Sequence, residues 1–185
     1  MSSGLERQLT TYIRQYREDG ILLDTNVLLL YWAYRFDKTL VGGKRLEKYT
    51  LDAAELLDDC VAQFQRILTT ATILTEFSNL FAQMLSGRKK RDMFARMLPL
   101  FTAPTPPTIL HRSADGVAML HRSIDGIALE AEVFQSLGFT DASIVAIAQG
   151  QHFVLTDDLD LFLTIQKRGS ATINFTHMRE AVGLL

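Results

Sequence analysis

Short apolar runs recur along the chain and alternate with segments of helical periodicity. The runs are ILL at 21–23, TTATI at 69–73, FVL at 153–155 and ATINF at 171–175. Each has the length of a buried strand, and each is followed by a segment that predicts a helix. The alternation therefore predicts an α/β fold, a three-layer α/β/α sandwich around a mostly parallel sheet of about four or five strands.

Length and composition indicate one domain with an embellishment, because the chain has 185 residues. We expect a helical extension over residues 1–19, with its helix at 3–18, and one domain over 20–185. The start lacks the apolar segment of a secretory signal, and no uncharged apolar run approaches the roughly 18 residues of a membrane span. The single cysteine fits a reducing compartment. We therefore expect a soluble, cytoplasmic protein with no membrane partner.

Asp24 stands between two apolar segments, in the stretch ILLDTNVLLL at 21–30. An ionised carboxylate is costly to bury unless it is paired, hydrogen-bonded or bound to metal. Asp24 follows an expected strand and precedes an expected helix, which is the edge of a parallel sheet where ligands bind. Helix capping is the other interpretation, because Asp24, Thr25 and Asn26 are all suitable caps, and Asn26 is the expected one.

Three further acids occupy comparable positions, namely Glu76, Asp141 and Asp158. Each is expected at a strand end or in a first helical turn, where a lone acid is explained by capping or by the helix dipole. Four such positions, with Asp24, can converge on one rim of one sheet. Clustered carboxylates repel each other and raise each other's pKa values. An all-oxygen cluster of this kind suits Mg²⁺ or Mn²⁺.

Four motifs in this chain resemble, in order, the acidic motifs of the PIN-domain nucleases, a family that includes the toxins of VapBC-type toxin–antitoxin modules. They are LLDTNVLL, ILTEFSNL, FTDASIVAIA and VLTDDLDLF, within residues 20 to 175. The resemblance implies a PIN-like fold in which four carboxylates are both catalytic and metal-binding: Asp24, Glu76, Asp141 and Asp158. It also implies that Asn26, Thr156 and Asp157 support the site, with Thr25 and Thr140 as further candidates.

The activity implied by the resemblance is hydrolysis of RNA phosphodiester bonds, with Mg²⁺ or Mn²⁺ as cofactor and 5′-phosphate and 3′-hydroxyl products. Water is the expected nucleophile, because Cys60 is expected in the core and the four histidines lack metal-ligand spacing. The implied partners are an RNA substrate, a protein antitoxin and a second copy in a homodimer. The segment between Asn26 and Glu76 is longer than in compact toxins, which leaves the toxin role open.

A basic run offers candidate RNA contacts, since phosphate contacts dominate affinity for RNA. It comprises Arg88, Lys89, Lys90 and Arg91. A solvated helix face is the alternative for so short a run. The aromatic segment 31–36 is expected in the core, although exposed rings can stack on bases or form a dimer contact.

Two other functions compete with the ribonuclease. A non-catalytic PIN-like module would bind RNA or protein without cutting it, but the four acids are intact. A phosphatase of the haloacid-dehalogenase type needs a second Asp two residues after the first, where this chain has Asn26. The tandem repeat at 111–120 and 121–130 is assigned no chemistry.

Overall fold

The computed structural model describes residues 3–102, 117–120, 131–149 and 152–185. Its strands are β1 (Ile21–Leu23), β2 (Ile67–Thr70), β3 (Val117–Leu120), β4 (Phe153–Thr156) and β5 (Thr172–Asn174). Its helices are α1 (Ser3–Tyr16), α2 (Thr25–Phe36), the 3₁₀ helix η1 (Lys38–Leu40), α3 (Leu51–Val61), α4 (Ala71–Met84), α5 (Gly87–Thr102), α7 (Ala131–Leu137), α8 (Phe139–Ala148), α9 (Leu159–Lys167) and α10 (Phe175–Ala181).

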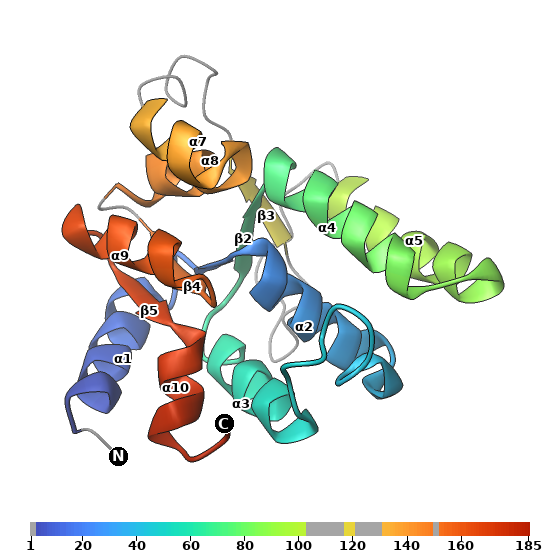
Figure 1. Ribbon diagram of the computed structural model, residues 1–185, viewed down its shortest axis with the longest axis horizontal. Coiled ribbons are helices and arrows are strands. Elements are labelled where there is room, and N and C mark those ends of the chain that lie inside the picture. The colour runs from blue at the N-terminus through green and yellow to red at the C-terminus, as the bar shows by residue number, and fades with distance from the viewer. Residues whose placement is uncertain (1–2, 103–116, 121–130, 150–151) are drawn as a thin grey trace.

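The five strands form one parallel sheet in the order β3-β2-β1-β4-β5 (Figure 1). The chain adds strands on one side of β1 as far as β3, and then returns to place β4 on the other side. The strand order therefore reverses at β1 and β4, and ligands of open parallel sheets bind outside the carboxyl ends of the strands at such a reversal.

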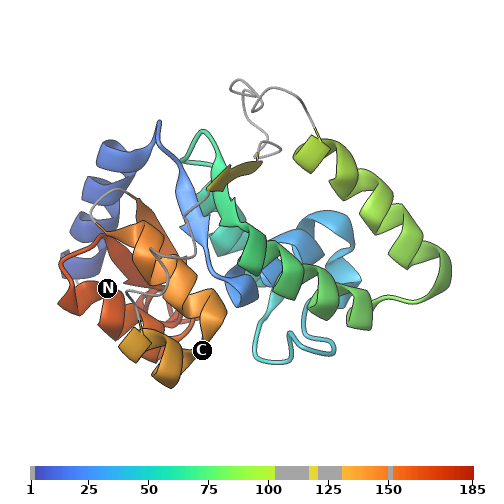
Figure 2. The ribbon, with the colours of Figure 1, turned by 90° about the horizontal axis from the view of Figure 1, so that it is seen from above.

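Helices cover both faces of the sheet, as the predicted three-layer sandwich requires. Figure 2 shows α2, α4 and α5 on one side of the sheet and α1, α8 and α9 on the other. This division follows from right-handed crossovers, because the direction of strand addition changes after β3. The fold class predicted from the sequence is confirmed.

The core is continuous from the sheet into α1. The side chains of β1 are fully buried, as expected for a strand covered by helices on both faces. The ring of Phe153 in β4 lies 5.3 Å from Tyr12 and 6.3 Å from Tyr16, centroid to centroid. The first helix thus packs on the sheet of the main domain. Every helix in the described part of the chain is too short or too polar to span a membrane.

Several predicted boundaries are wrong. The capping pattern at Asp52 predicts a helix through Leu68, but that helix ends at Val61 and β2 begins at Ile67. The basic amphipathic stretch from residue 88 predicts a helix that ends near Pro99, but that helix continues to Thr102. Strand β3 was not predicted at all, and it lies within the tandem repeat, whose other residues fall outside the described ones. The cap of α2 is Asp24 and not Asn26.

Candidate active site

The site lies where β1 and β4 end side by side. The two strands pair in parallel, with Leu23 opposite Leu155, so the residues that follow them emerge at the same edge. Asp24 follows β1 directly, and Asp157 and Asp158 follow β4. This edge is the point at which the strand order reverses, so the topology itself brings two of the four predicted acids together.

Asp24 is buried and bonded through both carboxylate oxygens. Its Oδ1 accepts the backbone N–H of Val27 at 2.7 Å, which caps α2. Its Oδ2 accepts the hydroxyl of Thr156 and the backbone N–H of Asp157, the latter at 2.8 Å. Burial raises the pKa of Asp24, and these hydrogen bonds oppose that rise. The helix-cap and active-site interpretations of Asp24 are therefore compatible.

The charges of the other three predicted acids all act on Asp141. It is the third residue of α8, whose N-cap is Gly138 and has no side-chain cap hydrogen bond, so Asp141 is not the cap. Burial, and then the negative charges of Asp158, Asp24 and Glu76, raise the pKa of Asp141 to about 7. The charges of the other three predicted acids thus reach Asp141, although the four acids come from four separate motifs.

Glu76 and Asp158 are the two exposed residues among the four predicted acids. Both side chains are exposed, and Asp158 also caps α9 by accepting the backbone N–H of Leu161 at 2.8 Å. Glu76 was expected in a first helical turn, but it is the sixth residue of α4. Its Oε2 accepts the hydroxyl of Thr25 at 2.8 Å, which ties α4 to the residue after Asp24.

The donor chemistry of this site fits a hard divalent cation. Mg²⁺ and Mn²⁺ take oxygen ligands, and the acids that meet here offer only carboxylate oxygens. Burial first, and then the charges of the neighbouring carboxylates, raise the pKa of Asp141, and a cation would offset the second of these causes. Among the described residues, no group of three or more Asp, Glu, His or Cys side chains is arranged to hold an ion as it stands. The acids are near enough for their charges to interact, and binding of an ion would require the exposed side chains of Glu76 and Asp158 to move toward it.

Asp157 anchors the site to two distant segments. Its carboxylate accepts the Tyr49 hydroxyl at 2.5 Å, pairs with the Lys48 ammonium at 2.5 Å and accepts the Thr176 hydroxyl. Burial raises the pKa of Asp157, but these partners outweigh burial and hold the pKa below its usual value. The backbone N–H of the same residue holds Asp24. The loop before α3 therefore helps to fix Asp24, a contribution that sequence reasoning missed.

A chain of hydroxyl groups joins α4 to α8. The Thr72 hydroxyl lies 2.7 Å from that of Thr70 and 2.6 Å from that of Ser143. Ser143 in turn donates to the backbone carbonyl of Thr140 at 2.6 Å. This chain holds the helix of Asp141 against the helix of Glu76. Thr140 was a candidate support, and it takes part through its backbone carbonyl.

Two predicted groups lie outside these contacts. Asn26 is exposed, and no hydrogen bond between described residues involves its side chain, so its supporting role stays a prediction. The basic run 88–91 begins α5, beyond the far end of α4 (Figure 1). Lys89 in that run pairs with Asp37 at 2.6 Å. Since α4 continues eight residues past Glu76, the run begins roughly 12 Å or more from Glu76.

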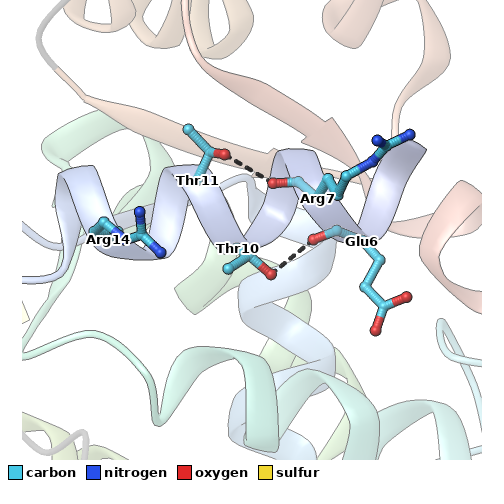
Figure 3. Close-up of a pocket in the computed structure, with 5 residues that line it drawn as sticks. All are labelled: Glu6, Arg7, Thr10, Thr11 and Arg14. Carbon is cyan, nitrogen blue, oxygen red and sulfur yellow. Dashed lines mark hydrogen bonds between the residues drawn. The ribbon is translucent and has the colours of Figure 1, made fainter. Parts of the chain in front are cut away.

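Two surface hollows differ in their relation to the acids. One of about 620 Å³ lies along α1 and is lined by a single helix (Figure 3). Its Thr10 and Thr11 hydroxyls already donate to backbone carbonyls one turn earlier, both at 2.8 Å. The other, of about 470 Å³, is lined by α4 and the start of α8 and includes Glu76. Only this second hollow adjoins the acidic site.

Cys60 is buried as predicted, and burial raises the pKa of its thiol to about 12. His152 and His177 lie at the start of β4 and in α10, whereas His111 and His121 fall outside the described residues. In the aromatic segment 31–36, Tyr31 is buried and the other rings are partly buried against the core.

No protein-family model, curated protein or solved structure matches this chain.

Proposed function

We propose that this chain is a divalent-metal-dependent ribonuclease that hydrolyses RNA phosphodiester bonds to 5′-phosphate and 3′-hydroxyl products. The observation that carries the proposal is the environment of Asp141. Burial and the charges of Asp158, Asp24 and Glu76 raise its pKa to about 7. Repulsion among nearby carboxylates is costly, and a cation bound among them would relieve it. Mg²⁺ or Mn²⁺ is the cation that such donors favour.

Each residue has a distinct part in this proposal. Asp24 would hold the ion from a fixed position, because three donors restrain its carboxylate. Thr25 would orient Glu76 through its hydrogen bond. Asp141 would release its proton when the ion binds, so affinity for the ion should rise with pH. A bound Mg²⁺ or Mn²⁺ supplies an activated water and neutralises charge on the phosphoryl oxygens.

The surroundings of the side chains favour water as the nucleophile. Asp24 is only 4% exposed and has both oxygens engaged, so it is poorly placed to accept a phosphoryl group as a phosphatase nucleophile would. The Cys60 thiol is buried with its pKa raised to about 12, and it would attack as a thiolate only at high pH. Hydrolysis by an activated water requires neither group to act.

The resemblance to PIN-domain toxins extends the proposal to partners. On that resemblance the chain would be a cytoplasmic toxin-type protein, held inactive by a protein antitoxin and paired with a second copy in a homodimer. The sequence motifs support these statements, and the geometry of the acids bears on the chemistry alone. A binding assay against small proteins encoded beside the gene would test the antitoxin.

The decisive experiment compares wild type with Asp141→Asn on structured and single-stranded RNAs in Mg²⁺ or Mn²⁺. We expect wild type to cleave, EDTA to stop cleavage, and Asp141→Asn to lose most turnover with little change in RNA affinity. Asp52→Asn is the matched control, because Asp52 is an exposed acid in the first turn of α3. This control should cleave like wild type.

Three outcomes would reject the proposal. Equal cleavage by wild type and Asp141→Asn would mean that a contaminant cuts the RNA. Binding without cleavage by every preparation would favour the non-catalytic RNA-binding module. End-group analysis of the products completes the test, since 2′,3′-cyclic phosphate ends would exclude attack by water.

A further inference from the structure

An exposed aromatic ring stands beside the acidic site. Phe139 is the first residue of α8, two residues before Asp141, and its side chain is 47% exposed. Its ring meets that of Phe134 edge to face, with 6.2 Å between the centroids and 88° between the planes. This geometry is favourable for an aromatic pair, so a second ring orients Phe139 while leaving it accessible.

Phe139 lines the 470 Å³ hollow together with polar residues of α4. Thr72, Glu76 and Asn79 are spaced four and three residues apart, which places them on one face of α4. The hollow has the size of a pocket for one small ligand or one unit of a polymer. Its walls combine an aromatic surface with hydroxyl, carboxylate and carboxamide groups.

The charge of the lining argues for a neutral occupant. Among the described residues that line the hollow, Glu76 is the one charged group and none is Lys or Arg. A phosphate would meet this negative charge without compensation. A nucleobase is neutral, has a flat face that stacks on an aromatic ring, and has edge groups that hydrogen-bond to Asn and Thr side chains.

We infer that this hollow is a subsite for one unpaired base of the RNA, next to the phosphate that is hydrolysed. The inference rests on the proposed function, because Glu76 belongs both to the hollow and to the acidic site. A base in this hollow is therefore one that flanks the reacting phosphate. Bases within a duplex are already stacked and paired, so the substrate class is single-stranded RNA or a loop. Phe139 is the stacking residue, and Asn79 reads the edge of the base.

The test measures binding of short single-stranded RNAs in EDTA, where the RNA stays intact. A 2-aminopurine is placed at each position in turn, since its fluorescence reports stacking. We expect Phe139→Leu to weaken binding about 5- to 30-fold, in the lower range of losses on removing a stacking ring. Phe139→Trp should keep the affinity, because it restores a ring. A fully paired duplex should bind equally to wild type and Phe139→Leu.

A double-mutant cycle separates stacking from a general loss of structure. An abasic unit at the position that reports stacking should weaken binding to wild type but cause no further loss with Phe139→Leu. Independent, additive losses, or equal binding by wild type and Phe139→Leu, would overturn the inference. If wild type still cleaves RNA in Mn²⁺ in those cases, the proposed function stands without the subsite. Absence of both cleavage and binding would overturn the two together.

Discussion

Replacing Asp141 by Asn should stabilise the metal-free protein at neutral pH. The pKa of Asp141 is raised from 3.8 to about 7, so ionising it in the folded state costs free energy. A difference of roughly 3 in pKa corresponds to about 4 kcal/mol as a ceiling. The side chain is only partly buried, and solvent screening reduces the expected gain to about 1–2 kcal/mol. Asn has the same shape and no charge, so it avoids this cost.

The stabilisation by Asp141→Asn should increase with pH. The folded-state pKa is the higher one, so the favourable contribution of protonated Asp141 is fully present below about pH 4. It is lost as pH rises through 7. Asp141→Asn should therefore match wild type near pH 4 and exceed it by pH 8. Urea unfolding in EDTA at pH 4.5, 6 and 8 measures the difference, and Asp52→Asn should show no such trend.

Adding Mn²⁺ should reverse the order of stability. An ion that binds only the folded protein adds about 2.7 kcal/mol at 100 times its Kd. Wild type should gain this amount, and Asp141→Asn should gain much less. An identical pH dependence of the two proteins in EDTA would refute the electrostatic argument for Asp141. Equal stabilisation by Mn²⁺ would separately refute its place among the metal ligands.

Three further predictions follow from the contacts of the site. Asp24→Asn should destabilise the fold by about 1–3 kcal/mol in urea unfolding, because an amide has one acceptor oxygen for three donors. If repulsion between the carboxylates dominated, Asp24→Asn would instead stabilise the fold. An unchanged or increased free energy of unfolding would therefore contradict the hydrogen-bond argument. Tyr49→Phe should also destabilise by about 1–3 kcal/mol, because it removes a donor from buried Asp157; an unchanged urea midpoint would contradict this. The double substitution Lys90→Ala and Arg91→Ala should weaken RNA binding and reduce its salt dependence by about two phosphate contacts, while turnover stays unchanged. An unaltered salt dependence would mean that this face of α5 is solvated and does not contact RNA.

The sequence predicts those strands whose evidence is local. β1, β4 and β5 are apolar runs bounded by Gly or polar residues, and all three lie where the runs predict them. β2 was misplaced because Ile67 and Leu68 also continue the helical pattern of α3, and periodicity cannot separate a short buried strand from a buried helix. β3 pairs with β2, with Val117 opposite Ile67; its apolar run VAML at 117–120 follows Gly116, but it was not predicted because it lies in the tandem repeat.

The same distinction applies to the site. Asp24 and Asp158 are recognisable because their motifs cross a strand-to-helix boundary, whereas Asp141 and Glu76 lie within helices and are recognisable only through their motifs. Tyr49 is not recognisable, since it meets Asp157 across 108 positions of the sequence and sits in a loop with no motif. Ser143 is a similar case, because its bond to Thr72 spans 71 positions. Sequence reasoning therefore finds the acids and the supports inside their motifs, such as Thr25 and Thr156, and misses the supports that lie outside the motifs or act across the fold.

The sequence allows Asp24 to be either a helix cap or a metal ligand, and in the structure capping leaves room for both roles. A carboxylate has about four acceptor sites, and Val27, Thr156 and Asp157 occupy three of them. One remains for a cation, on a side chain that cannot retreat. The exposed acids Glu76 and Asp158 have fewer restraints. A rigid buried ligand at the end of β1 would thus set the position of the ion, while exposed ligands close around it when it arrives.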